Sequence, residues 1–363
     1  EIPLRLVGSE MCIRDRYSIC NFEGICKSDT LQKGQMLQRE STLQSLKDAG
    51  FNMLLLANNH ITDYGECGLR QTITSIDQYG FDRMGAGFEY NDVYRPHVLN
   101  IAGLKIGIIN LCEAQLGQFK EKDQSHGYAW LGDYELDERI RTLRKEVDYL
   151  IVIPHAGLES YSVPLKQFRH LYQHWCDLGV DVVVGGHPHI SQGIEQYGNS
   201  IIFYSLGNFF FTGFNGEIDT WTKGISCVLH FSEKGISYDV IQHRMNDECV
   251  STVHTDINDI EAKNYILAND ESYKKALKEQ NAIAFEALPM RLYMSALNGT
   301  SSCDSLVTKI KKIIFYLINR KSLYAGTEKY RMSVLKRLTE NETYRYLTIS
   351  AIEDQLGEND QRL

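Results

Sequence analysis

The chain has 363 residues, of which 43% are hydrophobic, so it can bury the core of one large domain with a smaller appendage, or of two domains. Its 47 acidic side chains outnumber its 38 basic ones and give a formal net charge of −9, which argues against non-specific nucleic-acid binding as its main function. The sequence has no apolar run of about 18 residues, so it predicts no membrane-spanning segment.

The start of the chain differs from the rest of the sequence. Residues 1–16 (EIPLRLVGSEMCIRDR) contain no strand-then-glycine pattern and look like a translated cloning or sequencing-adapter fragment, so we expect a non-native leader there. No intact signal peptide is visible, and the 9 scattered cysteines form no Cys-x-x-Cys pair, which favours free thiols in a reducing compartment over disulfides. The sequence leaves the compartment open: cytoplasmic for the chain as given, and membrane-anchored or exported if a native N-terminus is missing.

Between residues 17 and 255, short apolar runs alternate with helical patterns. In chain order we expect a strand at 17–20, the end of a helix at 43–50, a strand at 52–57, a helix at 68–79, a hairpin of 97–101 with 105–110, a helix at 136–145, a strand at 149–153, a helix at 165–178, a strand at 180–184 and a hairpin from 193–195 to 201–205. Apolar strands separated by helices indicate an α/β layered sheet, and the hairpins make that sheet mixed rather than purely parallel.

The character of the sequence changes near residue 256, where strand patterns disappear. Helical patterns occupy 261–297, 306–319 and 329–356, with a linker (NGTSS) at 298–302. We therefore divide the chain into a leader (1–16), an α/β domain (17–255) and a helical C-terminal region (256–363). Residues 309–321 combine positive charges with apolar residues; a core-packing helix with solvated lysines is favoured there over a helix lying on a membrane surface.

Polar clusters come directly after the predicted strands. Ligand sites gather at the carboxyl ends of strands in open α/β sheets, so these clusters are candidate site residues. They are Asn21-Phe22-Glu23-Gly24, Asn58-Asn59-His60, Pro154-His155, His187-Pro188-His189 and Ser205-Leu206-Gly207-Asn208.

The segment His187-Pro188-His189 is the strongest of these clusters. Two imidazoles two residues apart on a turn can point into one site, and the preceding glycines allow close approach of the backbone. Histidine is a common ligand for zinc, iron and manganese, whereas a pair of surface or core histidines is the alternative. Because His155 and the pair Asn59-His60 also come after strands, these three segments together favour a metal site.

Other residues complete this hypothesis. Glu23 is the candidate carboxylate that balances the charge of the cations, although a solvated loop glutamate would look the same in sequence. Asn59 would bind metal through its amide oxygen, and His60 is better placed as a general acid or anion-stabilising group. Asp63 could orient His60 by accepting a ring N–H, or could cap the next helix.

Several segments together resemble a known family. They are ANNHITDYGECGL, the GAG at 85–87, HAGLE at 155–159 and GVDVVVGGHPHISQGIEQYGNSIIFYSLGNFFF, and they resemble CapA-type poly-γ-glutamate capsule-biosynthesis proteins. That family is similar in fold to the calcineurin-like metallophosphoesterases. The resemblance covers roughly residues 17–231 in the right order, which implies a metallophosphoesterase-like domain with a helical appendage after it.

The resemblance implies a ligand set for two divalent metal ions (Mn, Fe or Zn). Glu23 would bridge the metals, with Asn59, His155 and His187 on one metal and His189 on the other. The family's first strand ends in a Gly-Asp pair whose aspartate binds the first metal, and no convincing equivalent is recognisable here. The first metal would then keep only Glu23 and His189, and we expect weaker binding because each lost ligand also removes charge compensation.

The remaining roles are implied by the same resemblance. His60 stands at the position of the catalytic histidine, and Ser205 and Asn208 would line the site or brace its loop. The implied chemistry is two-metal hydrolysis of a phosphoester, with His60 protonating the leaving oxygen.

The expected partners are a phosphoester or anionic polymer substrate and, peripherally, a membrane or a capsule-synthesis complex. The alternatives are a non-catalytic polymer-binding or export subunit that retains the fold, and an enzyme inactivated only by truncation.

Overall fold

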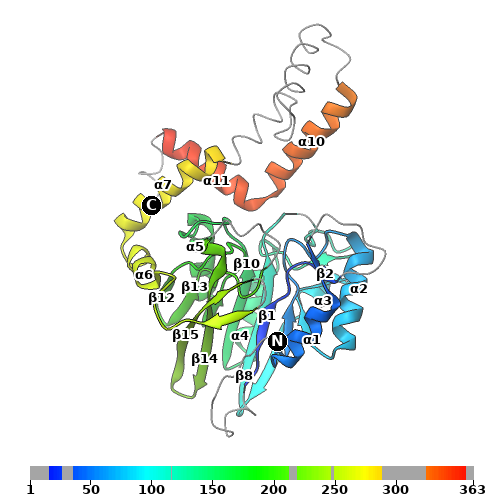
Figure 1. The fold of residues 1–363 in the computed structure, drawn as a ribbon, viewed down its shortest axis with the longest axis vertical. Coiled ribbons are helices and arrows are strands. Elements are labelled where there is room, and N and C mark those ends of the chain that lie inside the picture. Colours follow the sequence, from blue (N-terminus) through cyan, green and yellow to red (C-terminus); the bar gives the residue numbers. More distant parts are fainter. Residues whose placement is uncertain are drawn as a thin grey trace. The chain divides into compact units, whose positions relative to one another are not determined.

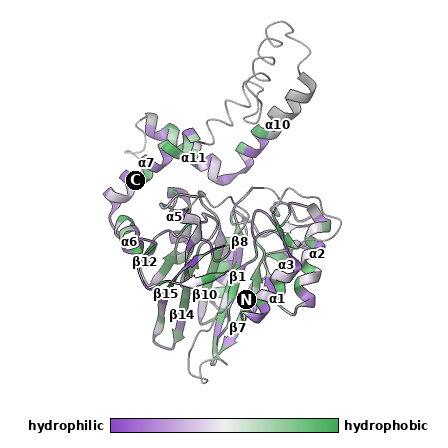
Figure 2. Ribbon diagram, in the orientation of Figure 1, coloured by the Kyte–Doolittle hydropathy of each residue, from purple (hydrophilic) through white to green (hydrophobic). Residues whose placement is uncertain are grey.

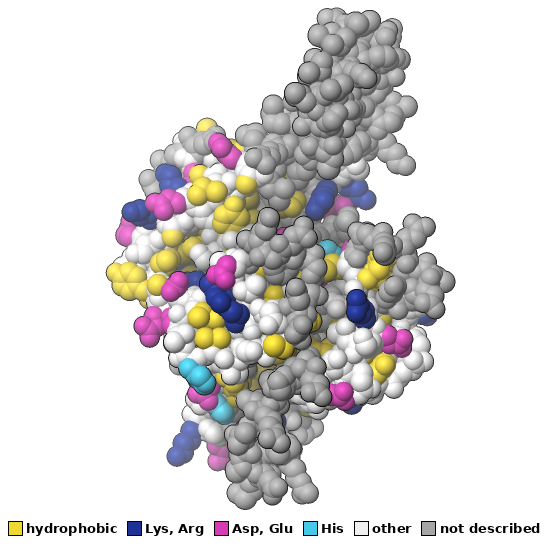
Figure 3. Space-filling view, in the orientation of Figure 1, with side chains coloured by type: hydrophobic (Ala, Val, Ile, Leu, Met, Phe, Trp, Pro, Cys, Tyr) yellow, Lys and Arg dark blue, Asp and Glu magenta, His cyan; other side chains and the backbone are white. Residues whose placement is uncertain are grey.

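The computed structural model describes residues 16–26, 36–115, 117–211, 219–246, 249–287 and 324–356. The chain divides into two compact units, Glu1–Tyr273 and Lys274–Leu363. The first unit is built from layered sheets and helices, which Figure 1 shows in sequence colours from blue to yellow. Figure 3 shows acidic, basic and apolar side chains interspersed over the described part of the surface in that view.

A six-stranded mixed sheet forms the centre of the first unit. Its strand order is β12 (Ile194–Tyr197), β13 (Ser200–Phe203), β11 (Val182–Val184), β10 (Tyr149–His155), β8 (Leu104–Cys112) and β7 (His97–Ile101). The four inner strands are parallel, and each edge strand is the antiparallel arm of a hairpin. This confirms the predicted α/β mixed sheet and both of its hairpins.

A second, parallel sheet carries the N-terminal half of the site. It consists of β1 (Ile19–Asn21), β4 (Met53–Leu55) and β5 (Asp82–Met84), with β4 in the middle. Helices α1 (Glu40–Asp48) and α2 (Gly65–Gln78) cover one face, where Leu43 and Leu69 are fully buried in one core cluster. Alternate residues of β4 enter different clusters, since Leu54 packs with these helices and Met53 with the central sheet. The strand is therefore buried on both faces, as its apolar run predicted.

A third sheet, for which the sequence analysis named no strands, packs on the central sheet. It is antiparallel and consists of β14 (Lys223–Ser232), β15 (Gly235–Met245) and β16 (Val250–Thr252). Ile225, Cys227, Leu229 and Phe231 recur at every second position of β14, and all four join the core cluster of the central sheet. This period of two is the signal of a strand with one apolar face.

Helices α4 (Leu136–Arg144) and α5 (Lys166–Asp177) also pack against the central sheet. α4 lies close to β8, since a Cβ added at Gly107 would come within 3.1 Å of the Leu143 side chain. On α5, Tyr172 and Trp175 are buried, and the Tyr172 ring stacks on Tyr204. Figure 2 shows the central strands mostly in the hydrophobic colour. The helices show both colours, as expected for helices with one solvent-exposed face.

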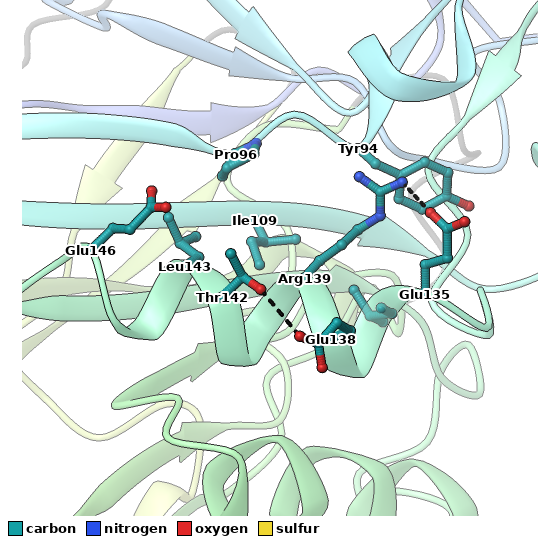
Figure 4. A pocket seen from close by; sticks show the side chains of 10 residues that line it. Tyr94, Pro96, Ile109, Glu135, Glu138, Arg139, Thr142, Leu143 and Glu146 are labelled. Atoms are coloured by element: carbon teal, nitrogen blue, oxygen red, sulfur yellow. Dashed lines mark hydrogen bonds and ion pairs between the residues drawn. The ribbon is translucent and has the colours of Figure 1, made fainter.

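Short elements complete the first unit. They are the paired strands β2 (Ile25–Cys26) and β3 (Leu37–Gln38), the paired strands β6 (Ala86–Gly87) and β9 (Gly127–Tyr128), the helix α3 (Tyr90–Val93) and the 3-10 helix η2 (Asp219–Thr222). A cavity of about 380 Å³ lies along α4, and Figure 4 shows Arg139 and Glu135 at one end of it. It is lined by none of the predicted site residues.

The C-terminal region is helical where it is described, but two predicted helices are broken. The predicted helix 261–297 is split into α6 (Ile260–Ala268) and α7 (Asp270–Ala287), and the predicted helix 329–356 into α10 (Tyr324–Glu340) and α11 (Glu342–Leu356). Asn269 accepts a hydrogen bond from the Ser272 N–H at 2.9 Å, and Asn341 accepts one from the Tyr344 N–H at 2.8 Å. Each asparagine therefore caps a new helix, a role that apolar periodicity does not reveal.

The first compact unit extends past residue 255 and includes α6. Lys263 donates to the Ser191 carbonyl at 2.9 Å, and Arg169 donates to the Leu267 carbonyl at 2.9 Å and to Glu195 at 2.7 Å. The proposed boundary between residues 255 and 256 stays a prediction. The linker 298–302, the helix 306–319 and the basic stretch 309–321 lie outside the described residues, as does the leader except for Arg16. No described helix is long and apolar enough to cross a membrane.

Candidate metal centre

The predicted site residues come together at the carboxyl ends of parallel strands. β1 leads to Glu23, β4 to Asn59, and β11 to His187, whereas His155 is the last residue of β10 rather than the first residue after it. A bridge pairs His155 with Gly186, so the ends of β10 and β11 stay in register up to the histidines. Sheet topology thus brings together residues more than a hundred positions apart.

The loop that carries His187 and His189 has a constrained backbone. Both histidines adopt left-handed φ angles, 95° and 61°, which are uncommon outside glycine. A Cβ added at Gly185 would overlap the carbonyl oxygen of Tyr204, so only glycine fits there. Such strain persists only where the surroundings impose it, and it is frequent at functional sites.

Four side chains form what we call the inner site: Glu23, Asn59, His155 and His187. His155 Nε2 lies 3.0 Å from Asn59 Oδ1, 3.1 Å from His187 Nδ1 and 3.7 Å from Glu23 Oε1. Ligand atoms held about 2.1 Å from a tetrahedral metal are separated by roughly 3.4 Å, so this set fits a divalent cation.

The protonation of the inner site suits a cation. Burial, followed by the charge of nearby imidazoles, holds the pKa of His155 and of His187 well below the usual value, so both rings are neutral and can donate lone pairs. Burial also raises the pKa of Glu23, with the nearby His189 acting against this. Glu23 Oε1 is buried and has no hydrogen-bond partner among the described residues. A cation there would satisfy this oxygen and restore the charged form of Glu23.

His189 lies on the other side of Glu23 and is held by Asn208. Its Nε2 is 3.8 Å from Glu23 Oε1, and its Nδ1 is 2.9 Å from Asn208 Oδ1. The Asn208 amide nitrogen donates to the Trp221 carbonyl at 3.1 Å, so its oxygen faces His189 and accepts the Nδ1–H. The Nε2 lone pair is thereby directed toward Glu23.

Asn208 therefore braces His189, in line with one of the two roles expected for it. The Ser205 hydroxyl accepts a hydrogen bond from the Gly207 N–H at 3.2 Å and so supports the same loop.

His60 and Asp63 are paired as predicted. His60 Nδ1 lies 2.9 Å from Asp63 Oδ2. Burial lowers the pKa of His60, but the hydrogen bond to Asp63 and the charges of Glu23 and Glu159 outweigh burial and raise it. Proximity to these charges places His60 beside the centre; its catalytic role stays a prediction.

Asn58 joins the two N-terminal segments of the site, a role the sequence analysis did not assign. It is fully buried, its amide nitrogen donates to the Phe22 carbonyl at 2.9 Å, and its oxygen accepts the His60 N–H at 3.2 Å. This side chain therefore fixes the segment that carries Glu23 against the segment that carries Asn59 and His60.

Sequence reasoning also missed Glu113 and Gln115. Glu113 is fully buried and accepts a hydrogen bond from Gln115 Nε2 at 2.7 Å, while Gln115 Oε1 accepts one from the Asn59 amide nitrogen at 3.2 Å. This chain of hydrogen bonds turns the Asn59 oxygen toward His155. Glu113 comes directly after β8, so its position after a strand was the signal that could have revealed it.

Glu159 also lies near the histidines, although its sequence context offered no reason to assign it a role. Among the described residues, two groups could hold a metal ion: Glu23 with His155 and His187, and Glu159 with His187 and His189, the ligand atoms of each group lying within 4.8 Å of one another. Glu159 Oε1 is 3.8 Å from His187 Nε2, whereas His187 Nδ1 faces His155 in the inner site.

The fold and the site define the class of the protein: an α/β layered-sheet protein with histidine, asparagine and carboxylate side chains gathered in a candidate metal centre. The chain belongs to the family described as bacterial capsule synthesis protein PGA_cap, whose model matches residues 9–213. The matched range holds every residue that we assign to the inner site. It begins within the expected leader, whose origin stays a prediction.

Relatives with named functions agree with this family. The chain is 34% identical over 177 residues to the capsule biosynthesis protein CapA of Bacillus anthracis, which covers 48% of this chain and 43% of that protein. It is 31% identical over 173 residues to the PGA biosynthesis protein CapA of Bacillus subtilis, which covers 47% of this chain and 46% of that protein. The matches thus span less than half the length of each relative.

Similar solved structures include two from Thermus thermophilus. One is the sulfate thiohydrolase SoxB, with a TM-score of 0.38 and 11% identity over 55% of this chain and 34% of that one. The other is a 5′-nucleotidase precursor, with a TM-score of 0.37 and 15% identity over 70% of this chain and 46% of that one.

Proposed function

We propose that this protein is a metal-dependent hydrolase of the phosphoesterase type that acts in the biosynthesis of poly-γ-glutamate or a related capsular polymer. The observation that carries the proposal is the convergence of Asn59, His155 and His187 beside the unpartnered oxygen of Glu23. The family and the named functions of the Bacillus relatives support the polymer, which is anionic.

The ligand set supports two divalent cations, Mn, Fe or Zn. Asn59, His155 and His187 would hold one cation, His189 the other, and Glu23 would lie between them. When bound, such cations polarise the phosphoryl group and lower the pKa of water. The neutral imidazoles and the carboxylate supply the lone pairs that both positions need.

His60 is proposed as the general acid. Its Nδ1 is engaged by Asp63, so Nε2 is the atom left to give a proton to the leaving oxygen. Because Asp63, Glu23 and Glu159 raise the pKa of His60, its protonated form is favoured before the reaction. Asp63 then stabilises the orientation of the ring during proton transfer.

A phosphodiesterase assay tests this function. We expect the chain to hydrolyse bis(p-nitrophenyl) phosphate with Mn²⁺, to lose activity in a chelator, and to regain it when Mn²⁺ is restored. His60→Ala should lower kcat by about 10²–10⁴-fold without changing metal content, as expected for the loss of a general acid.

The control is His230→Ala, because His230 is on the surface and pairs with Asp239. Activity that survives both the chelator and His60→Ala would contradict the proposal. Binding of Mn²⁺ and poly-γ-glutamate without any turnover would identify the alternative, a non-catalytic polymer-binding or export subunit.

A further inference from the structure

We propose that Glu159 is a metal ligand of this centre and that it holds, with His189 and Glu23, the second of the two cations. We call these three residues the outer site. The inference rests on the proposed two-cation function and adds a ligand that the family resemblance did not supply. Among the described residues, Glu23 and His189 are the ligands already assigned to this cation, and Glu159 would be the third.

The Glu159 carboxylate lies near both histidines of the His187-Pro188-His189 segment. The ligand atoms of Glu159, His187 and His189 lie within 4.8 Å of one another, and His189 Nε2 is 3.8 Å from Glu23 Oε1. His187 directs Nδ1 to the inner site, so it is not needed as a ligand of the outer site. Glu159 and Glu23 thus each bring a carboxylate oxygen within reach of the His189 ring.

The segment bearing Glu159 is fixed to the loop that carries His187 and His189. The Ser160 N–H donates to the Pro188 carbonyl at 2.8 Å, and the Trp221 indole N–H donates to the Ser160 hydroxyl at 2.8 Å. Ser160 has a left-handed φ of 67°, and a Cβ added at Gly157 would lie 2.9 Å from the Pro188 ring. These contacts therefore hold the loop that bears Glu159 in place, although the Glu159 side chain is 52% exposed.

The buried oxygen of Glu23 favours a cation in the same place. Glu23 Oε1 is buried without a hydrogen-bond donor among the described residues. A divalent cation held by Glu23 and Glu159 would be attracted to both carboxylates. The outer site would then have two carboxylates and one imidazole, a set that suits Mn²⁺ better than the inner set of two imidazoles, one amide oxygen and one carboxylate does.

Titration of the chelator-treated chain with Mn²⁺ tests the inference, by calorimetry for stoichiometry and by electron paramagnetic resonance for coupling between ions. We expect two Mn²⁺ per chain and an exchange-coupled spectrum. Glu159→Gln should bind one Mn²⁺ with the spectrum of an isolated ion and should weaken the second binding step by more than tenfold. The matched control is Glu138→Gln, because Glu138 is an exposed glutamate on α4.

The outcomes separate this inference from the proposed function. A Glu159→Gln chain that still binds two coupled Mn²⁺ ions would overturn the inference, as would a wild-type chain that binds only one ion. In both cases the inner site would stand. A wild-type chain that binds no Mn²⁺ would overturn the proposed function as well. Thermal unfolding of the metal-free variants should match the wild type, because Glu159 is half exposed and is not part of the core.

Discussion

The inner and outer sites differ in the burial and the spacing of their ligands. In the inner site, Asn59, His155 and His187 are less than 8% exposed, and neighbouring donor atoms are 3.0–3.1 Å apart. In the outer site, His189 Nε2 is 3.8 Å from Glu23, and Glu159 is 52% exposed. His155 ends a strand and the other inner ligands follow closely after strands, whereas the outer site depends on Glu159, which an exposed loop presents. Preorganised ligands bind metal more tightly, so we expect the inner site to fill first.

The largest expected effect is the loss of an inner ligand. His155→Ala should weaken binding of the first Mn²⁺ by more than about 100-fold, because removal of even an indirect partner of a metal ligand lowers affinity by about 10–100-fold. Calorimetric titration measures this, with His230→Ala as the control on an exposed histidine. If His155→Ala binds the first ion as tightly as the wild type, the inner site is wrongly assigned.

Two adjacent glycines test how the strand ends hold the inner site. Gly185→Ala should destabilise the fold by about 3 kcal/mol, because its Cβ would overlap the Tyr204 backbone and the core resists added volume. Gly186→Ala should have little effect, because its Cβ would lie 3.9 Å from the nearest atom, His155 Nδ1. Urea unfolding measures both, and equal destabilisation by the two substitutions would contradict this account of the loop.

Loss of the hydrogen bonds that orient Asn59 should lower metal affinity less than loss of a metal ligand does. Gln115→Ala should weaken the inner site by about 10–100-fold, because Asn59 loses the partner that orients its amide. Competition with a metal-binding dye reports this affinity. Gln44→Ala is the control, since Gln44 is exposed and bonds only within α1. Unchanged affinity in Gln115→Ala would show that the strand end alone positions Asn59.

The smallest effect is expected at the brace of the outer site. Asn208→Ala should weaken binding of the second Mn²⁺ by about 10-fold, the lower end of the range for a residue that orients a metal ligand. Binding of the first Mn²⁺ should stay unchanged. The reason is that, among the described residues, Asn208 hydrogen-bonds to His189, Trp221 and His243 and not to an inner ligand. Stepwise calorimetry resolves the two steps. Equal weakening of both would show that the two sites are not held independently.

The sequence predicted the inner site better than its surroundings. Short apolar runs located the strands, and the polar residues after them identified Glu23, Asn59, His155 and His187, because parallel strand ends meet at one edge. Glu113 also comes directly after a strand, β8, but a single glutamate at such a position does not by itself indicate a metal ligand. Glu159 was visible within HAGLE, yet its approach to His189 depends on loop conformation, which the sequence does not specify.

The rest of the fold was missed for identifiable reasons. The apolar positions of β14 alternate, but Val228 lies between them and obscures the period. Breaks between helices were missed because Asn269 and Asn341 fit either inside a helix or as a cap, and only their hydrogen bonds distinguish the two.

The central claim is that the gathered histidines and Glu23 bind divalent metal in the folded chain. The most direct test compares thermal unfolding of the chelator-treated chain with and without Mn²⁺, with bound metal counted by mass spectrometry. The account predicts bound metal and a higher unfolding temperature, since about 2.7 kcal/mol of stability is gained when free metal is 100-fold above Kd. A chain that retains no metal and unfolds at the same temperature with saturating Mn²⁺, Fe²⁺ or Zn²⁺ would contradict it.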